Sequence, residues 1–162
     1  MNAKVLFIQT EEVNSMNEST KPDSVLISEH GDRTLPDEKY DRLARILLAE
    51  VAKELWPHGE FLEEMKLVLN QTGLPTHDKN LILGNIVLDG CGVAEKQIRT
   101  HTRQNRCSRI FLEGVYKHYL NGSEFSRSKF ISAIHRSLER MTDLKDSIKI
   151  WLHAELLLSA ND

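Results

Sequence analysis

The fold class is decided by the stretch Pro36-Asp-Glu-Lys-Tyr-Asp-Arg-Leu-Ala-Arg-Ile-Leu-Leu-Ala-Glu-Val-Ala-Lys-Glu-Leu55. Its apolar side chains recur every three or four residues, which is the spacing of a helix that buries one face. Pro36 suits a first helical turn, and Asp37 and Glu38 lie near the positive end of the helix dipole. The following Trp56-Pro-His-Gly59 predicts the end of this helix.

The same periodicity continues to the C-terminus. We expect a second helix over residues 60–70 and a third from about Thr76, as its N-cap, to Asp89. The third helix is apolar nearly all round, so we expect it to be central in the core. A fourth helix is predicted over 94–120 with a break near 106–108. A fifth is expected to be capped by Ser126, and a last helix follows a break at Asp143.

These elements predict an all-α protein, a five- to six-helix bundle of packed helical hairpins with short connections. Residues 36–162 are expected to form a single helical domain, preceded by an N-terminal arm over residues 1–35. Two short segments of the arm, 4–9 and 24–28, have strand composition. Because two isolated strands are marginally stable in water, the arm either forms a β-hairpin on the body or is loosely ordered, and we favour the second.

The composition indicates a cytoplasmic protein. The longest apolar runs are far shorter than the roughly 18–20 residues of a membrane span, and the N-terminus lacks the long apolar region of a signal peptide. The two cysteines, Cys91 and Cys107, lie far apart in the sequence and are expected to be reduced. No metal-binding, phosphate-binding or nucleophile motif occurs, so we expect no enzymatic activity, no cofactor and no metal.

Positive charge is concentrated in one part of this acidic chain. Residues 96–140 hold ten Lys and Arg against three acids, a net charge of +7, whereas the whole chain is −3 and the remainder is therefore −10. At helical spacing, five basic residues at the start of this part share a sector of roughly 140°. This arginine stripe comprises Lys96, Arg99, Arg103, Arg106 and Arg109.

Three interpretations of the arginine stripe remain open. The planar guanidinium group forms paired hydrogen bonds with both phosphates and carboxylates. The stripe could therefore bind nucleic acid or an acidic protein partner. In the third interpretation it is a solvated face whose charges pair with acids elsewhere in the chain. The acids considered for that pairing are Glu50, Glu54, Glu60, Glu63 and Glu64.

A helix-turn-helix motif is one specific way for the stripe to meet DNA. Over residues 87–101, Gly92 would occupy the turn, Val93 would follow it, and Ile98 would be the apolar residue six positions later. The second helix would present Lys96, Arg99 and their neighbours to a major groove. The Gly90-Cys-Gly92 turn is equally suitable as an ordinary connection between two helices.

The last third of the chain resembles a known family. Val115-Tyr-Lys-His-Tyr-Leu-Asn-Gly122, Ser137-Leu-Glu139 and Asp143 match an apolar helix ending in Leu-x-Gly, a second ending in Ser-Leu-Glu, and an acidic-capped last helix. Over residues 110–160 the chain resembles the YmgB/AriR family of small enterobacterial regulators of biofilm formation and acid resistance. The resemblance implies an all-α, dimeric, non-catalytic connector that feeds the Rcs phosphorelay, and DNA binding is also suggested for the family.

We therefore expect a non-enzymatic regulatory protein, an adaptor or connector that binds a signalling or transcription protein and modulates it. The alternatives are a helix-turn-helix transcriptional regulator and a phage- or plasmid-encoded inhibitor of a host protein. The last helix has more large apolar residues than one face of a small monomer needs, which predicts a homodimer contact. The residues of that contact are Trp151, Leu152, Leu156 and Leu157.

Overall fold

The computed structural model describes residues 37–92 and 102–161, and within these ranges it contains six helices and no strand. The expected all-α bundle is confirmed. The N-terminal arm and residues 94–101 of the predicted fourth helix lie outside the described ranges. The helices are α1 (Asp37–Leu55), α2 (Phe61–Gln71), α3 (Thr76–Gly90), α4 (Thr102–Leu120), α5 (Glu124–Arg140) and α6 (Asp146–Ala160).

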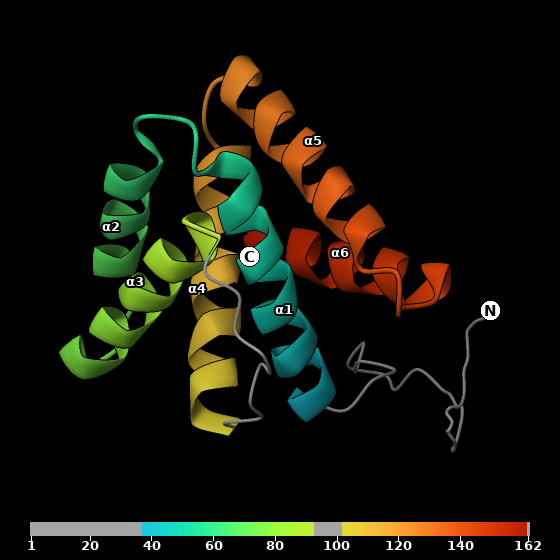
Figure 1. Cartoon of the computed structure of the whole chain (residues 1–162), viewed down its shortest axis with the longest axis horizontal. Helices are drawn as coiled ribbons and strands as arrows, with labels where there is room; N and C mark the ends of the chain where they lie inside the picture. The colour runs from blue at the N-terminus through green and yellow to red at the C-terminus, as the bar shows by residue number, and fades with distance from the viewer. Residues whose placement is uncertain (1–36, 93–101, 162) are drawn as a thin grey trace. The chain divides into compact units, whose positions relative to one another are not determined.

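Helix α4 is the hub of the bundle, since it contacts α2, α3, α5 and α6. Figure 1 shows α2 and α3 on one side of α4, α5 and α6 on the other, and α1 crossing in front. Hydrogen bonds between α1 and α4, one donated from each helix, confirm that these two helices lie against each other. Four side chains of α4 are completely removed from solvent at the centre of the core: Phe111, Leu112, Val115 and Tyr116.

The third helix is not the central one, and this expectation was wrong. Eleven of the 19 residues of α1 are buried, whereas α3 buries four of its 15. Leu81 and Leu88 of α3 are 43% and 46% exposed. An apolar run indicates that a helix is able to be buried. Whether each of its faces is covered depends on how the other helices pack around it. Helices α1 and α4 occupy the interior instead.

Three expectations about helix ends and breaks also need correction. Helix α4 continues through residues 106–108, where Cys107 and Ser108 are buried in the bundle. The cap of α5 is Ser123 rather than Ser126, because the Ser123 hydroxyl accepts the backbone N–H of Ser126 at 3.1 Å. Thr76 is the first residue of α3, so its side chain is not the N-cap.

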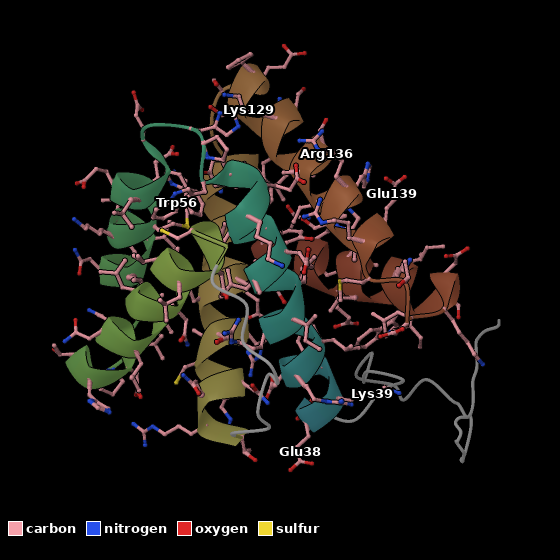
Figure 2. All side chains as sticks on the ribbon, in the orientation of Figure 1. Glu38, Lys39, Trp56, Lys129, Arg136 and Glu139 are labelled. Carbon is pink, nitrogen blue, oxygen red and sulfur yellow. The ribbon has the colours of Figure 1, made fainter. Side chains whose placement is uncertain are left out.

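Trp56 closes the turn between α1 and α2 and fixes the end of α3 (Figure 2). Its ring lies edge-on to Phe61, with ring centroids 6.4 Å apart. A Cβ at Gly90 would overlap the indole and lie 2.9 Å from its Cγ atom. Gly90 therefore lets the last turn of α3 approach the end of α1 more closely than any other residue would.

Candidate binding surfaces

The described part of the arginine stripe is the first half of α4, and its three arginines have different surroundings. Arg109 is partly buried, with its side chain 22% exposed. Its Nε donates to Asp41 of α1 at 3.0 Å and its Nη1 to Glu113, one turn further along α4, at 3.1 Å. Burial opposes its charge, but these two carboxylates outweigh burial and raise the pKa of Arg109. Arg109 joins α1 to α4 and is not a residue of an open binding face.

Arg103 is both bonded and exposed. Its Nε and Nη2 donate to the two oxygens of Asp78 in α3, at 3.2 and 2.8 Å. This forked pair lowers the pKa of Asp78, because the guanidinium stabilises the charged carboxylate. Burial and the Asp78 carboxylate raise the pKa of the adjacent Cys107 thiol. The Arg103 side chain is nevertheless 74% exposed, whereas that of Asp78 is only 6% exposed.

Arg106 lies one turn beyond Arg103 on α4 and is exposed. Within residues 37–92 and 102–161 it makes no ion pair shorter than 4 Å. Lys96 and Arg99 lie outside the described residues. Of the five residues of the predicted stripe, the structure therefore places Arg109 in a partly buried ion pair. It places Arg103 in an exposed ion pair with Asp78, and Arg106 in solvent.

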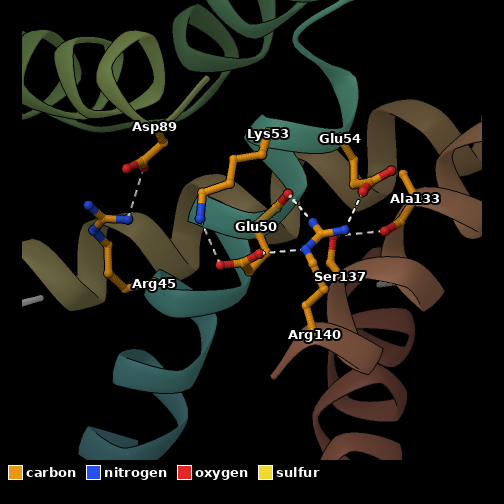
Figure 3. A network of polar contacts seen from close by, with 8 residues as sticks. All are labelled: Arg45, Glu50, Lys53, Glu54, Asp89, Ala133, Ser137 and Arg140. Carbon is orange, nitrogen blue, oxygen red and sulfur yellow. Dashed lines mark hydrogen bonds and ion pairs between the residues drawn. The ribbon is translucent and has the colours of Figure 1, made fainter. Parts of the chain in front are cut away.

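The acids considered as partners of the stripe bind other groups. Glu50 and Glu54 of α1 face α5, where Arg140 Nε donates to Glu50 at 2.8 Å and Nη1 donates to Glu54 (Figure 3). Arg136 Nε also donates to Glu54, at 2.7 Å. The pKa of Glu54 is lowered because Arg136 and Arg140 stabilise its charged form.

Glu64 accepts the hydroxyl of Tyr119 at 2.8 Å. Glu60 and Glu63 are exposed, and Glu63 binds Lys66 at 3.2 Å. The idea that acids of the same chain pair with the stripe holds for Arg103 and Arg109, but with Asp78, Asp41 and Glu113 as the acids. Sequence reasoning missed Asp78 and Asp41 because nothing local links positions 25 or 68 residues apart. Glu113 is four residues from Arg109 on the same helix, so helical spacing was a signal that could have found it.

The predicted helix-turn-helix is only partly visible. Helix α3 ends at Gly90, and Gly92 has a left-handed backbone with a φ of 77°. A side chain at that φ is strained, so the turn favours glycine at the position where the motif requires it. The expected second helix, with Lys96 and Arg99, lies in the range 93–101, outside the described residues.

Helix α3 presents a second apolar face to solvent. His77, Leu81, Gly84 and Leu88 are exposed and fall within a sector of about 60° at helical spacing. The opposite side of the helix holds Ile82 and Ile86, which are at most 1% exposed. Apart from the chain neighbours of Gly84 and the nearby backbone of α3, no described atom lies within 4 Å of the place that a Cβ of Gly84 would take. We call these four residues the α3 face.

The two glycines of α3 give a matched prediction. Gly84→Ala should raise the free energy of unfolding by about 0.5–1 kcal/mol, because alanine favours helix and the space is open. Gly90→Ala should lower it by about 1–3 kcal/mol, because the new methyl group displaces the Trp56 indole. Urea denaturation followed by circular dichroism measures both. Changes of the same sign in the two variants would contradict the packing described at Gly90.

Helix α6 also has an uncovered apolar side. Ile150 and Leu158 are 70% and 63% exposed, and the exposed Ala154 lies between them. The exposed stripe of α6 consists of Ser147, Ile150, Ala154 and Leu158, and none of these is charged. The charged residue exposed on this helix is Asp146, its first residue, with a side chain 95% exposed.

Two leucines of the predicted dimer contact are not available to a second copy. Leu152 and Leu156 are 0% exposed because they fill the core beneath α6. Trp151 lies edge-on to Tyr40 of α1, with ring centroids 5.5 Å apart. Trp151 and Leu157 are partly exposed, so the accessible apolar side of α6 is rotated away from the predicted one.

A pair of histidines joins α5 to α6. The rings of the exposed His135 and the half-buried His153 have centroids 5.6 Å apart. His153 Nδ1 lies 2.8 Å from the hydroxyl of the buried Tyr116. Burial disfavours the charged form of His153, and His135 adds like charge, so the pKa of His153 is lowered.

We expect this lowered pKa to make the fold less stable in acid. Below the ordinary histidine pKa of about 6.5 the unfolded chain binds a proton that the folded chain accepts only at lower pH. The contribution of His153 is therefore present above pH of about 6.5 and is lost as pH falls through the folded pKa. Urea denaturation across this range should show a flatter pH profile for His153→Gln than for wild type. His58→Gln, at an exposed position, is the control, and an unchanged profile for His153→Gln would contradict the assignment.

The described ranges contain neither a metal-type cluster nor a membrane-spanning helix. No cluster of three or more His, Cys, Asp or Glu side chains within them could hold a metal ion. None of the described helices is both long enough and apolar enough to cross a membrane. Comparison with protein-family models, curated proteins and solved structures found no match. The resemblance to the YmgB/AriR family therefore stays a prediction.

Proposed function

We propose that this chain is a non-enzymatic cytoplasmic adaptor that binds a signalling or transcription protein and modulates its activity. One observation carries the proposal: α3 and α6 each bury one face in the bundle and present a second apolar face to solvent. Single exposed apolar residues are ordinary, but stripes of them mark surfaces that bind other proteins. Asp41 and Glu113 support the same conclusion, because they neutralise Arg109, a charge that DNA binding by the stripe would need.

The two faces suit different roles. A twofold contact places a surface against its own copy, so a charge close to the axis meets a like charge. From Ser147 to Leu158 the exposed stripe of α6 has no charged residue, and a twofold axis near Ala154 would place Ile150 against the Leu158 of a second chain. We therefore assign the homodimer contact to this stripe. Sedimentation of wild type and of Ile150→Lys with Leu158→Lys tests it, and an unchanged mass would refute the assignment.

The adaptor function is tested by affinity capture from a native lysate with four baits compared by quantitative mass spectrometry. These are wild type, Leu81→Lys with Leu88→Lys, Ile150→Lys with Leu158→Lys, and Phe125→Lys. Phe125 is 72% exposed on α5 and serves as the matched control. We expect a protein that wild type and Phe125→Lys capture and that one face variant loses. If all four baits capture the same proteins, the proposal fails.

DNA binding is the second candidate, and the left-handed Gly92 at the end of α3 favours it. The structure changes which arginines should be tested, because removing Arg103 would also strip Asp78 of its partner. Arg99→Ala with Arg106→Ala avoids this. If both side chains contact phosphates, the variant should reduce the salt slope of duplex binding by roughly 1.8, at about 0.9 per phosphate. Absence of duplex binding at about 50 mM salt would exclude this function.

A phage- or plasmid-encoded inhibitor of a host protein would use the same two apolar faces. The identity of the captured protein distinguishes such an inhibitor from a connector, as does the effect of the chain on that protein's activity.

A further inference from the structure

The charge beside the α3 face is unusual for an acidic chain. Helix α3 has two acids, Asp78 and Asp89, and both are buried and bound by arginines, Arg103 and Arg45 respectively. The first half of α4, residues 102–112, contains no acid. The exposed charges where α3 adjoins α4 are therefore those of Arg103 and Arg106. Neither α3 nor residues 102–112 of α4 has an exposed carboxylate that would compete for them.

Arg103 is held in place with donors to spare. A guanidinium has five N–H groups, and Arg103 uses one from Nε and one from Nη2 on Asp78. Its remaining N–H groups are available because the side chain is 74% exposed. Asp78 thus orients Arg103 in advance, which reduces the entropy lost when a second carboxylate binds. Arg106, three residues along the same helix, is a neighbour on that surface.

We propose that the α3 face binds an amphipathic helix with acidic residues on one flank. Its apolar side would cover Leu81 and Leu88, and its carboxylates would meet Arg103 and Arg106. This inference rests on the proposed adaptor function and names the chemistry of its partner.

The shape of the face favours a helix over other occupants. Leu81 and Leu88 are two turns apart, and Gly84 between them leaves space in which a second helix axis comes close. Apolar anchors at helical spacing with complementary charge at the rim are the features of helix-in-groove recognition. Nucleic acid would use the arginines, but the two leucines offer nothing to a phosphate backbone.

The test uses a display library of helical peptides selected on the full chain. Leucines are fixed at two-turn spacing, and the flanking positions vary among Glu, Gln and Lys. We expect enrichment of Glu on one flank, and loss of binding to Leu81→Lys with Leu88→Lys but not to Phe125→Lys. Gly84→Arg, at an open position, blocks the face without entering the core and gives a second variant. Enrichment of Lys or Gln, or no enrichment at all, would overturn the proposal.

A charge reversal tests the role of the arginine rim. Arg106→Glu should weaken an enriched Glu peptide by at least about tenfold. The same peptide with Lys at the contacting position should recover binding to Arg106→Glu. Equal binding of both peptides to both proteins would show that the rim does not select acidic partners.

Other occupants give distinct results. Carbene footprinting of the peptide-free chain should label Leu81 and Leu88; protection of both would mean that this chain already covers the face, and the proposal would be wrong.

Sedimentation should show the same mass for wild type and Leu81→Lys with Leu88→Lys; a smaller mass for the variant would identify a second copy as the occupant. Duplex binding lost in this variant would identify DNA. If peptide selection fails while lysate capture still depends on Leu81 and Leu88, the adaptor function stands with a partner of other chemistry.

Discussion

Asp89→Ala should destabilise the protein by about 3–5 kcal/mol, because it leaves a buried guanidinium without its carboxylate. Arg45 is 4% exposed, and its Nη1 contacts Asp89 at 3.3 Å (Figure 3). Removing an acid from the last turn of α3 also removes its unfavourable interaction with the negative end of the helix dipole, but this gain in stability is only about 0.3–1 kcal/mol. The loss of charge compensation is larger, so the net effect is destabilising.

The double variant Arg45→Met with Asp89→Leu is the control for Asp89→Ala. Replacing both members of a buried ion pair by apolar residues is often neutral or stabilising, so this variant should recover most of the lost stability. Urea denaturation followed by circular dichroism measures both proteins. A loss below about 1 kcal/mol for Asp89→Ala would show that water reaches Arg45 in solution.

Tyr40→Ala should lower the free energy of unfolding by a similar amount, about 3–5 kcal/mol, because it removes an aromatic ring from the core. Tyr40 is 0% exposed and joins three helices. Its ring packs edge-on against Trp151 of α6, its hydroxyl donates to Glu113 of α4 at 2.9 Å, and the Arg109 guanidinium lies 5.8 Å from the ring centroid. Removal of the ring opens a cavity at the meeting point of these helices.

Tyr40→Phe separates the ring from the hydroxyl. Glu113 still accepts from Arg109 at 3.1 Å and from Ser159 at 3.0 Å, so no buried acceptor is left unpaired. We expect a loss of about 0.5–1.5 kcal/mol for this variant. Denaturation at neutral pH measures both, and equal losses for Tyr40→Phe and Tyr40→Ala would contradict the importance of ring packing.

The helices could be predicted because their signals are local. Apolar spacing over residues 40–55 and the turn at 56–59 located α1, and the same reasoning located α2, α3 and α5 within a few residues. The cap of α5 was misplaced because Ser123 and Ser126 are both good capping residues in the sequence. Only backbone geometry decides which hydroxyl faces the first turn.

The candidate surfaces could not be read so directly. The arginine stripe was visible as a charge pattern, but Arg109 proved to be an interhelical contact because Asp41, 68 residues away, is folded against it. The α3 face was hidden inside an apolar run that predicted burial on every side. The apolar pattern of a sequence indicates which faces of a helix are able to be buried. Which of those faces are buried depends on the other helices that pack against it.

The position of α1 in the interior has a consequence for how the protein is made. Its partners Arg109, Arg140 and Trp151 all belong to the second half of the chain, and Arg140 is 90 residues from Glu50. During synthesis α1 therefore leaves the ribosome long before α4, α5 and α6 exist to cover it. Its apolar side must stay shielded from aggregation for that interval. We expect that the bundle assembles only after α6 has emerged, and that a nascent chain stalled after α3 is sensitive to protease throughout residues 40–90.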